Sequence, residues 1–497
     1  MTPLARATIV RGTFAAVLLA VVAPAQKGIA EPRAGVEIKP PKAWIELPGG
    51  VDRGATLRLF CAPRAITGRA EGASHTPLLR VMVFDKNGDA SADDKDGLPR
   101  RTPYRSLEDF VARGFGKAAK LTSREAGKAG ALEGQRFSAT LSLAGGDRTL
   151  YGFVQAIDGG ELVVAFEVYA DHLDKLKKDF DATLDGLASV PRDASVTAPD
   201  PQKTPELGWK ASKSKHWTVL SAADPAFTKK AITAAEIGRD WVVQEFGTIV
   251  QKTAKPAVLR IFPSADHYNA FIATTEAPRE YSSPRKELWF FEDKDAGSGD
   301  GFGMLFRAVL WHALDDVDTN ILPALPRWLD NGLWEYLRST KLKGKAIEFA
   351  PSEVETGRIG YQLRAESLPA LWNLVQGSMQ PSPQDGADEE LWGYTPECAR
   401  LVRWLCEHDG EKVFEKPGLL AGFCQSLGKH HARLLADPTA DVDTTRLDDA
   451  QRKELNKRHY AWRDALLKAV NDEYLPLTVE QWNAVNAKWQ KFNETYR

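Results

Sequence analysis

Between residues 40 and 190, several short runs are rich in apolar residues and are separated by turn sequences, a pattern typical of β-strands. The first run, LLRVMVF, covers residues 78–84. Three more runs are separated by the turn sequences GGD and DGG, and they cover residues 136–144, 148–157 and 161–170. Turns of this composition join neighbouring antiparallel strands, so the pattern predicts an antiparallel meander.

Two stretches of the same region have helical spacing instead. Residues 106–116 begin with Ser106 as a helix N-cap and carry acids in the first turn, where the helix dipole favours them. The second stretch, residues 171–187, places its apolar side chains at helical intervals, namely Leu173, Leu176, Phe180 and Leu184. We expect these helices to pack on one face of the meander, which is an α+β arrangement.

A stretch with four prolines and almost no large apolar residue, residues 191–208, predicts a linker. Beyond it the pattern changes to short strands mixed with longer helices. The predicted strands cover residues 216–221, 257–262 and 287–291. The predicted helices cover residues 225–247, 264–275, 302–317, 326–339 and 398–410. The sequence therefore predicts a second, mostly helical α+β domain over 209–440, followed by a charged helical extension over 441–497.

The composition is that of a folded globular protein. Of the 497 residues, 43% are hydrophobic and 27% are charged. The net charge of −2, without a strong local basic excess, argues against general affinity for nucleic acid.

The first residues have a different character from the rest. Arg6 and Arg11 precede an apolar run of about a dozen residues, and small residues follow the run at positions 23–25. This pattern predicts a secretory signal peptide over residues 1–25, and therefore export to the periplasm or beyond the cell. The alternative is an uncleaved membrane anchor, although the run is shorter than the ~20 residues that span a bilayer. No later segment is apolar enough to span one.

The cysteines and one acidic loop offer weaker signals. Among the four cysteines, Cys398 and Cys406 lie too far apart on one predicted helix to pair with each other. A disulfide between Cys424 and either of them remains open, and small buried thiols are the favoured interpretation. The loop at residues 85–94 has alternating oxygen side chains, but its glycine is misplaced for a calcium loop. A solvated acidic loop is the favoured interpretation.

The candidate chemistry lies in the stretch VLWHALDDVDTNILPALPRWLDNGLWEYL, residues 309–337. His312 and Asp316 are four residues apart, so they project from one face of the predicted helix and could share a divalent ion. Acids that could support them are Asp315, Asp330 and Glu335. The stretch contains no nucleophile elbow and no phosphate-binding glycine loop.

Residues 209–440 resemble the peptidase MA-like (gluzincin) metallopeptidases, whose metal helix reads HExxH and whose next helix supplies a glutamate ligand. Here the helix reads His312-Ala313-Leu314-Asp315-Asp316. The resemblance implies that His312 matches the first zinc ligand, Ala313 the catalytic glutamate and Asp316 the second histidine. Asn331 then stands at the third ligand and Glu335 at a supporting acid.

The resemblance implies a zinc site that has lost most of its ligands and its base. Only His312, Asp316 and Asn331 are metal candidates, so weak binding of a divalent ion such as zinc is the most that is expected. The Ala313 methyl group cannot accept a proton, and base catalysis is worth typically ~10²–10⁴-fold. Trp328, Trp334 and Tyr336 on the next helix either line a ligand cleft or pack in the core. A histidine such as His312 can also be simply a satisfied core residue.

Residues 40–190 resemble the PsbP-like domains, with a WIELP start, the SLEDF helix, the meander and the final KLKKDFDATLDGL helix. Members of that fold mostly act as binding or assembly modules, so this resemblance implies no chemistry.

Three functions remain open from the sequence. The favoured one is an exported, inactive pseudopeptidase that binds a peptide, protein or glycan. The second is a variant metal-dependent hydrolase that uses His312 and nearby acids. The third is a structural protein of the cell envelope.

Overall fold

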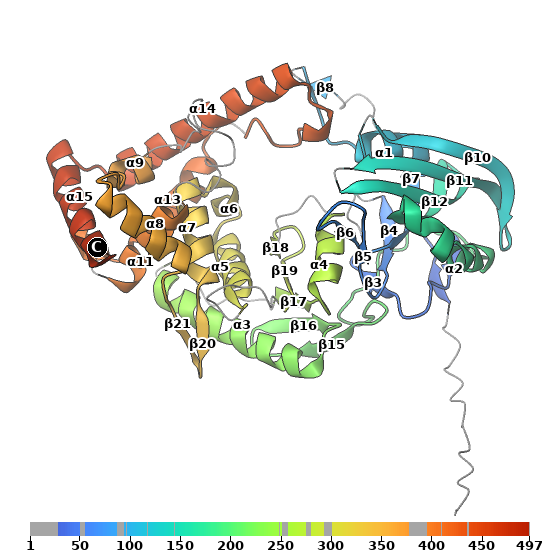
Figure 1. Ribbon diagram of the computed structural model, residues 1–497, viewed down its shortest axis with the longest axis horizontal. Coiled ribbons are helices and arrows are strands. Elements are labelled where there is room, and N and C mark those ends of the chain that lie inside the picture. The colour runs from blue at the N-terminus through green and yellow to red at the C-terminus, as the bar shows by residue number, and fades with distance from the viewer. Residues whose placement is uncertain are drawn as a thin grey trace, which may run out of the picture.

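The computed structural model describes residues 28–49, 55–86, 94–95, 97–116, 118–143, 145–247, 249–250, 257–274, 280–292, 301–376, 395–408, 410–434 and 437–496. The predicted signal peptide and most of the acidic loop at 85–94 lie outside these residues. The chain forms two lobes, an N-terminal lobe up to residue 189 and a C-terminal lobe from residue 210 (Figure 1). Each lobe has its own sheet, and helices are present in both, which confirms the α+β fold class.

The N-terminal lobe is built on a seven-stranded sheet of order β10-β11-β12-β13-β7-β4-β3, in which every pairing is antiparallel. Its strands are β3 (Ile45–Leu47), β4 (Thr56–Cys61), β7 (Leu78–Asp85), β10 (Lys120–Ala129), β11 (Leu132–Leu143), β12 (Gly146–Ile157) and β13 (Gly160–Tyr169). Short strands complete the lobe, namely β1 (Ile29–Glu31), β2 (Val36–Ile38), β5 (Ile66–Thr67), β6 (Ser74–His75), β8 (Asp94–Lys95), β9 (Leu98–Pro99) and β14 (Ala188–Ser189). The predicted meander corresponds to β11, β12 and β13. Strand β10 was not predicted, because most of its side chains are exposed and no apolar alternation marks it.

The two helices of this lobe lie on opposite faces of the sheet, so the expectation that they share one face is wrong. Helix α1 (Leu107–Gly114), capped by Ser106, packs in a cluster with Val163 and Ala165 of β13. Helix α2 (Leu173–Asp185) packs in a second cluster with Val164 and Phe166. Successive side chains of a strand point to opposite faces. Because β13 is buried at every position, it can hold a helix on each side.

The C-terminal lobe contains a five-stranded mixed sheet of order β15-β16-β17-β19-β18. Its strands are β15 (Lys210–Lys213), β16 (Trp217–Ser221), β17 (Ala257–Ile261), β18 (Tyr281–Ser282) and β19 (Glu287–Phe290), and a separate hairpin pairs β20 (Lys341–Lys343) with β21 (Ala346–Glu348). The helices are α3 (Pro225–Phe246), α4 (Ala265–Ile272), α5 (Gly303–Val317), α6 (Ile321–Ala324), α7 (Arg327–Arg338), α8 (Glu353–Arg364), α9 (Leu371–Gln376), α11 (Thr395–Glu407), α12 (Gly410–Val413), α13 (Leu419–His431), α14 (Asp449–Tyr474) and α15 (Val479–Asn493).

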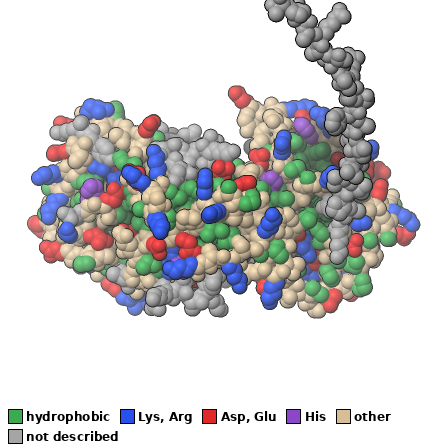
Figure 2. All heavy atoms as spheres, turned by 90° about the horizontal axis from the view of Figure 1, so that it is seen from below, with side chains coloured by type: hydrophobic (Ala, Val, Ile, Leu, Met, Phe, Trp, Pro, Cys, Tyr) green, Lys and Arg blue, Asp and Glu red, His purple; other side chains and the backbone are tan. Residues whose placement is uncertain are grey.

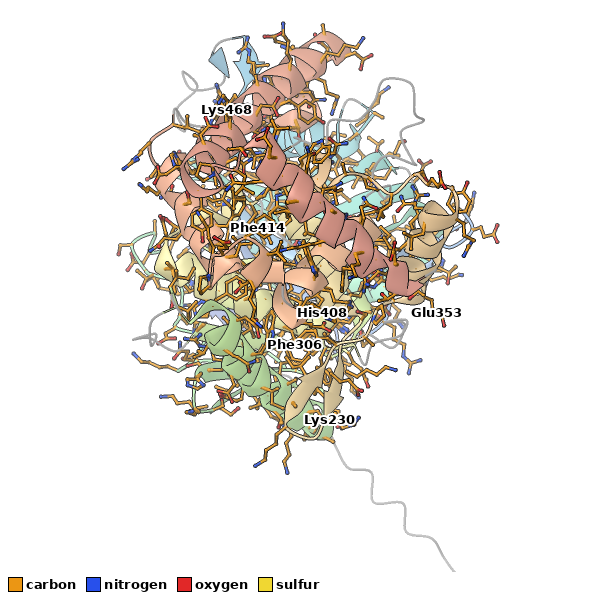
Figure 3. The ribbon with its side chains drawn as sticks, turned by 90° about the vertical axis from the view of Figure 1, so that its left-hand side faces the viewer. Lys230, Phe306, Glu353, His408, Phe414 and Lys468 are labelled. Carbon is orange, nitrogen blue, oxygen red and sulfur yellow. The ribbon has the colours of Figure 1, made fainter. Side chains whose placement is uncertain are left out.

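Helices α3 and α5 pack against each other and carry the candidate site. Gly238 of α3 lies where a side chain would collide with Phe306 of α5, since an added Cβ would be 2.8 Å from that ring. Phe306 is labelled beside α3 in Figure 3. A glycine at this contact lets the two helix backbones approach closely, which fixes the position of α5 above the sheet.

None of the helices in the described ranges combines the length and the hydropathy that a bilayer-spanning segment needs. Basic and acidic side chains are interspersed over the face of the molecule seen in Figure 2. All four cysteines are free thiols, so the possible pairing with Cys424 is not formed.

The two lobes share a buried apolar interface. Leu47, Leu59 and Leu78 of the first sheet pack in one cluster with side chains of the second lobe, which include Trp209, Leu220, Phe262, Tyr268, Phe271 and Trp289. The end of the predicted linker is part of this contact, because the backbone N–H of Leu207 donates to Glu46 at 3.1 Å. A second connection is made by α14, which crosses from the helical part of the C-terminal lobe toward β8 (Figure 1).

We predict that Phe262→Ala destabilises the whole chain, because Phe262 is fully buried at the interface against Trp209 and Phe271. The expected loss in unfolding free energy is about 3–5 kcal/mol, measured by chemical denaturation. Val479→Ala is the control, since Val479 is 72% exposed, and it should change stability by less than about 0.5 kcal/mol. An equal, small effect of both substitutions would contradict a packed interface.

Candidate functional site

Helix α5 places His312 in the interior of the C-terminal lobe. Most residues from Gly303 to Asp315 are buried, and His312 is only 4% exposed. Its ring lies at 5.8 Å from the ring of Trp217 on β16 and at 5.8 Å from that of Tyr281 on β18. The histidine therefore points toward the sheet and not into solvent.

The two nitrogens of His312 have different neighbours. Nδ1 lies 3.5 Å from the hydroxyl of Tyr281, and Nε2 lies 3.8 Å from Oδ2 of Asp316. The predicted pairing of His312 and Asp316 on one helix face is thus present. The Asp316 side chain is 30% exposed, so it is the part of this pair that solvent can reach.

Asp315 is the centre of the polar contacts. Its side chain is fully buried, and each carboxylate oxygen accepts at least one hydrogen bond. The Tyr281 hydroxyl donates to Oδ2 at 2.7 Å, and the Ser283 hydroxyl donates to Oδ1 at 2.7 Å. The Lys286 ammonium forms an ion pair with Oδ2 as well. These contacts join α5 to the hairpin of β18 and β19.

The turn of that hairpin brings the lysine into place. Ser282 of β18 pairs with Glu287 of β19, so residues 283–286 form the turn. Lys286 has a φ of +51°, in the left-handed region that non-glycine residues seldom adopt. Such a conformation costs of order 1 kcal/mol or more and persists only when its surroundings hold it. We infer that the ion pair with Asp315 contributes to holding it.

The electrostatics of the cluster follow from burial and from its cations. Burial lowers the pKa of His312; Asp316 opposes the shift, while Lys286 and Arg239 of α3 add to it. Burial alone would raise the pKa of Asp315, but the donors Lys286, Tyr281 and Ser283 hold it below its ordinary value. His312 is therefore neutral near pH 7, and Asp315 is ionised.

This arrangement is poorly suited to a divalent ion. Asp315 already has three donors, and Arg239 and Lys286 place positive charge beside the same carboxylates. A zinc site needs three or four well-placed ligands. Within the described ranges, no group of three or more His, Cys, Asp and Glu side chains is placed to hold a metal. Ala313 is 1% exposed and offers no proton acceptor.

The other predicted residues on α7 are spread over different surroundings. Asp330 accepts a hydrogen bond from Arg307 of α5 at 2.8 Å. Glu335 is buried and contributes to the raised pKa of Glu355, which arises first from burial of that carboxyl group. Asn331 is half-buried one position after Asp330. No described contact joins Asp330 or Glu335 to His312.

The three aromatic residues of α7 have separate partners. Trp328 is buried against Phe423, with ring centroids 5.5 Å apart. Tyr336 is stacked on Phe349 at 4.6 Å. Trp334 is half-buried beside the Arg307 guanidinium, at 4.8 Å. Trp328 and Tyr336 thus fill space between elements of the C-terminal lobe, and Trp334 is the one of the three with partial exposure.

Sequence reasoning missed Tyr281, Ser283, Lys286 and Arg239. Ser283 and the following proline are a turn signal, and the run ELWFF after them was recognised as a strand. However, only the fold brings this turn to α5, about thirty residues later in the chain. The sequence alone contains no signal for that contact.

Comparison with known proteins yields limited likeness. No family model matches the chain, and no curated protein matches it either. Among solved structures, the solution structure of cyanobacterial PsbP (CyanoP) from Synechocystis sp. PCC 6803 is 15% identical, with a TM-score of 0.21, and the match covers 33% of this chain and 91% of that one. A crystal structure from Bacteroides thetaiotaomicron VPI-5482 is 15% identical, with a TM-score of 0.22, and covers 46% of this chain and 63% of that one.

Both TM-scores are below 0.5, so neither likeness supports an inference about function. The solved structures that match the chain thus include a PsbP-like domain, at low identity and coverage. The peptidase MA-like resemblance of residues 209–440 gains no support from the family models and stays a hypothesis.

We predict that Asp315→Asn destabilises the protein in a pH-dependent way. A carboxyl group with a lowered pKa in the folded state contributes stability above its unfolded pKa, and that contribution is lost as pH falls through the folded pKa. The expected loss is roughly 1–3 kcal/mol at pH 7, and it should shrink below about pH 4. The measurement is urea denaturation of both proteins between pH 3 and pH 8.

Asp472→Asn is the matched control, since the Asp472 side chain is 66% exposed. It should change stability by less than about 0.5 kcal/mol at each pH. If Asp315→Asn lost as much stability at pH 3 as at pH 7, the charge of Asp315 would not be the source of its contribution.

Proposed function

We propose that the chain is an exported, catalytically inactive relative of the gluzincin peptidases that serves as a binding or scaffold module. The observation that supports this most directly is the ion pair between Lys286 and Asp315. In the proposed ancestry a metal ion would stand near His312 and its neighbouring carboxylates. In this chain an ammonium group neutralises the buried carboxylate instead.

Under this proposal the chain lacks two components that metal-dependent hydrolysis needs, a full set of metal ligands and a general base. Water activation at a metal requires an ion held by several ligands and a base that takes the proton. His312 and Asp316 are a pair at 3.8 Å, and the methyl group of Ala313 stands where the base would be. Asp315 is not a substitute base, because three donors hold it ionised and hydrogen-bonded.

A binding role would use the surface around Asp316, the exposed end of the cluster. Asp316 lies 3.8 Å from Nε2 of the buried His312 and interacts electrostatically with the Arg239 guanidinium. The proposed ligand is a peptide or protein segment, and the N-terminal lobe would add a second contact surface. A glycan is the alternative ligand.

A structural role in the cell envelope is the second candidate. It is favoured by the 4% exposure of His312 and by the Trp217 and Tyr281 rings packed on it. Under this alternative the space around His312 is filled by packed side chains, and the surface at Asp316 binds no partner molecule.

The first test is metal content and peptidase activity of the mature chain. We expect far less than one equivalent of zinc after incubation with zinc and gel filtration, and the same value for His312→Ala. Hydrolysis of a labelled casein substrate should equal the buffer control, with or without a chelator. Stoichiometric zinc that His312→Ala abolishes, or chelator-sensitive hydrolysis, would favour the variant hydrolase and overturn the proposal.

The second test separates binding from a structural role. A pool of labelled tryptic casein peptides is titrated with the protein, and binding is followed by fluorescence anisotropy. Asp316→Lys should weaken binding at least about tenfold, a change of 1.4 kcal/mol, while Asp472→Lys on α14 should leave it unchanged. Absence of binding, or equal binding by both variants, would remove the surface at Asp316 from the proposal.

A further inference from the structure

The segment that leads into α14 docks on the N-terminal lobe. Residues 437–455, which we name the clasp, contain the sequence Asp441-Val442-Asp443, which begins in a turn with a φ of +61° at Asp441, and the first turns of α14. Val442 forms an isolated antiparallel bridge with Arg100, just after β9. The bridge is flanked by two backbone hydrogen bonds, from Asp443 N–H to Pro99 at 2.8 Å and from Arg101 N–H to Asp441 at 2.7 Å.

Side chains reinforce this contact. The Arg100 guanidinium donates to the carbonyl of Ala440 at 3.0 Å, and that of Arg101 donates to the carbonyl of Val442 at 3.0 Å. Leu98 of the N-terminal lobe is buried in a small cluster with the clasp residues Val442, Leu447 and Leu455. We name residues 97–101 the docking edge. The edge is basic, and residues 441–443 of the clasp are acidic.

The clasp also has contacts within itself and with α14. Asp437, at its start, accepts hydrogen bonds from the backbone and hydroxyl of Thr439, at 2.8 and 2.7 Å, and lies 3.4 Å from Nδ1 of His459 on α14. Asp448 caps α14 through a capping box with Gln451. These local contacts allow the clasp to keep its shape as a unit.

Helix α14 connects the clasp to the C-terminal lobe by a stretch without a fully buried side chain. Its buried residues are Leu455 and then none until Leu466, so about three turns have no fully buried side chain. Figure 1 shows this part of α14 crossing between the two lobes. Trp462 is partly buried against the core of the C-terminal lobe, and Arg463 donates to the carbonyl of Leu325, so the residues between Leu455 and Trp462 form the bridge.

The cluster under the clasp is also small. It contains four buried residues, whereas the interface around Trp209 and Phe262 contains twelve. Regions with few buried apolar contacts open at lower free energy than the global unfolding. The clasp can therefore detach while the main interface keeps the lobes together.

We propose that the clasp is a releasable, self-docked segment, and that the docking edge takes an acidic, extended segment of a partner protein in its place. The chain's own Asp441-Val442-Asp443 shows the chemistry that the edge accepts: backbone pairing, one buried aliphatic side chain, and carbonyl groups that accept hydrogen bonds from Arg100 and Arg101, within an acidic sequence. Addition of an extended segment to an exposed backbone edge is a common mode of peptide recognition. This inference does not depend on the fate of the site at His312.

The first test is hydrogen exchange on the unmodified full chain. The amides of Arg101 and Asp443 should exchange at least about tenfold faster than that of Val164, which lies in the β12–β13 ladder. Raising NaCl from about 0.05 M to 0.5 M should speed exchange of the first two further, because salt screens opposite charges. Equal protection of all three amides would overturn release of the clasp.

The second test asks whether the edge accepts a segment in trans. The probe is a labelled synthetic peptide of residues 438–447, PTADVDTTRL. Val442→Lys should release the clasp, because it places a charge in the buried cluster beside Arg100. The peptide should bind this variant with a Kd below about 1 mM and bind the unmodified chain at least about tenfold more weakly.

The controls make the second test decisive. A peptide with lysine at both aspartate positions should not bind, and Val479→Lys, at a 72% exposed position, should behave as the unmodified chain. If Val442→Lys does not fold, Leu447→Ser removes a different buried residue of the same cluster and takes its place. Equal binding of both peptides, or no binding to a folded release variant, would overturn the proposed docking edge.

Discussion

The candidate site of the C-terminal lobe depends on the hydrogen bonds and the ion pair made by the buried carboxylate of Asp315. It is buried on α5, yet its partners Tyr281, Ser283 and Lys286 come from one hairpin at the edge of the sheet. A buried charge is tolerated only when it is paired and hydrogen-bonded. The need to satisfy this one group therefore fixes the hairpin against α5 and sets the surroundings of His312.

The same interaction decides what the site can do. Lys286 and Arg239 place two positive charges near the carboxylates that flank His312. A divalent cation and an ammonium group compete for the same oxygens, so the hairpin lysine acts against metal binding even where geometry would allow it. This constraint is compatible with the proposed binding role of the chain.

Much of the fold can be predicted from local pattern. Ser106 caps α1 as expected, and the three predicted strand runs correspond to β11, β12 and β13. Prediction failed where the relevant physics is not local. Strand β10 is exposed and lacks alternation, and the position of α1 and α2 on opposite faces follows from β13 being buried on both sides. The linker composition likewise gave no sign that Leu207 is held by Glu46.

For the candidate site, too, the sequence predicted the local arrangement on one helix but not the contacts made across the fold. Helical spacing placed His312 and Asp316 together, and they are 3.8 Å apart. It could not reveal that Lys286 reaches Asp315, because a contact across the fold leaves no trace in spacing along the chain. The resemblance to a peptidase directed attention to His312, Ala313 and Asp316, whereas the structure shows a cation, Lys286, paired with the neighbouring Asp315.

The most direct test of this account is a crystal structure of the chain grown with zinc, with anomalous data recorded at the zinc edge. The account predicts that Lys286 still pairs with Asp315 and that no zinc lies within about 2.1 Å of His312 Nε2. A zinc ion bound at His312, with Lys286 displaced from Asp315, would contradict it.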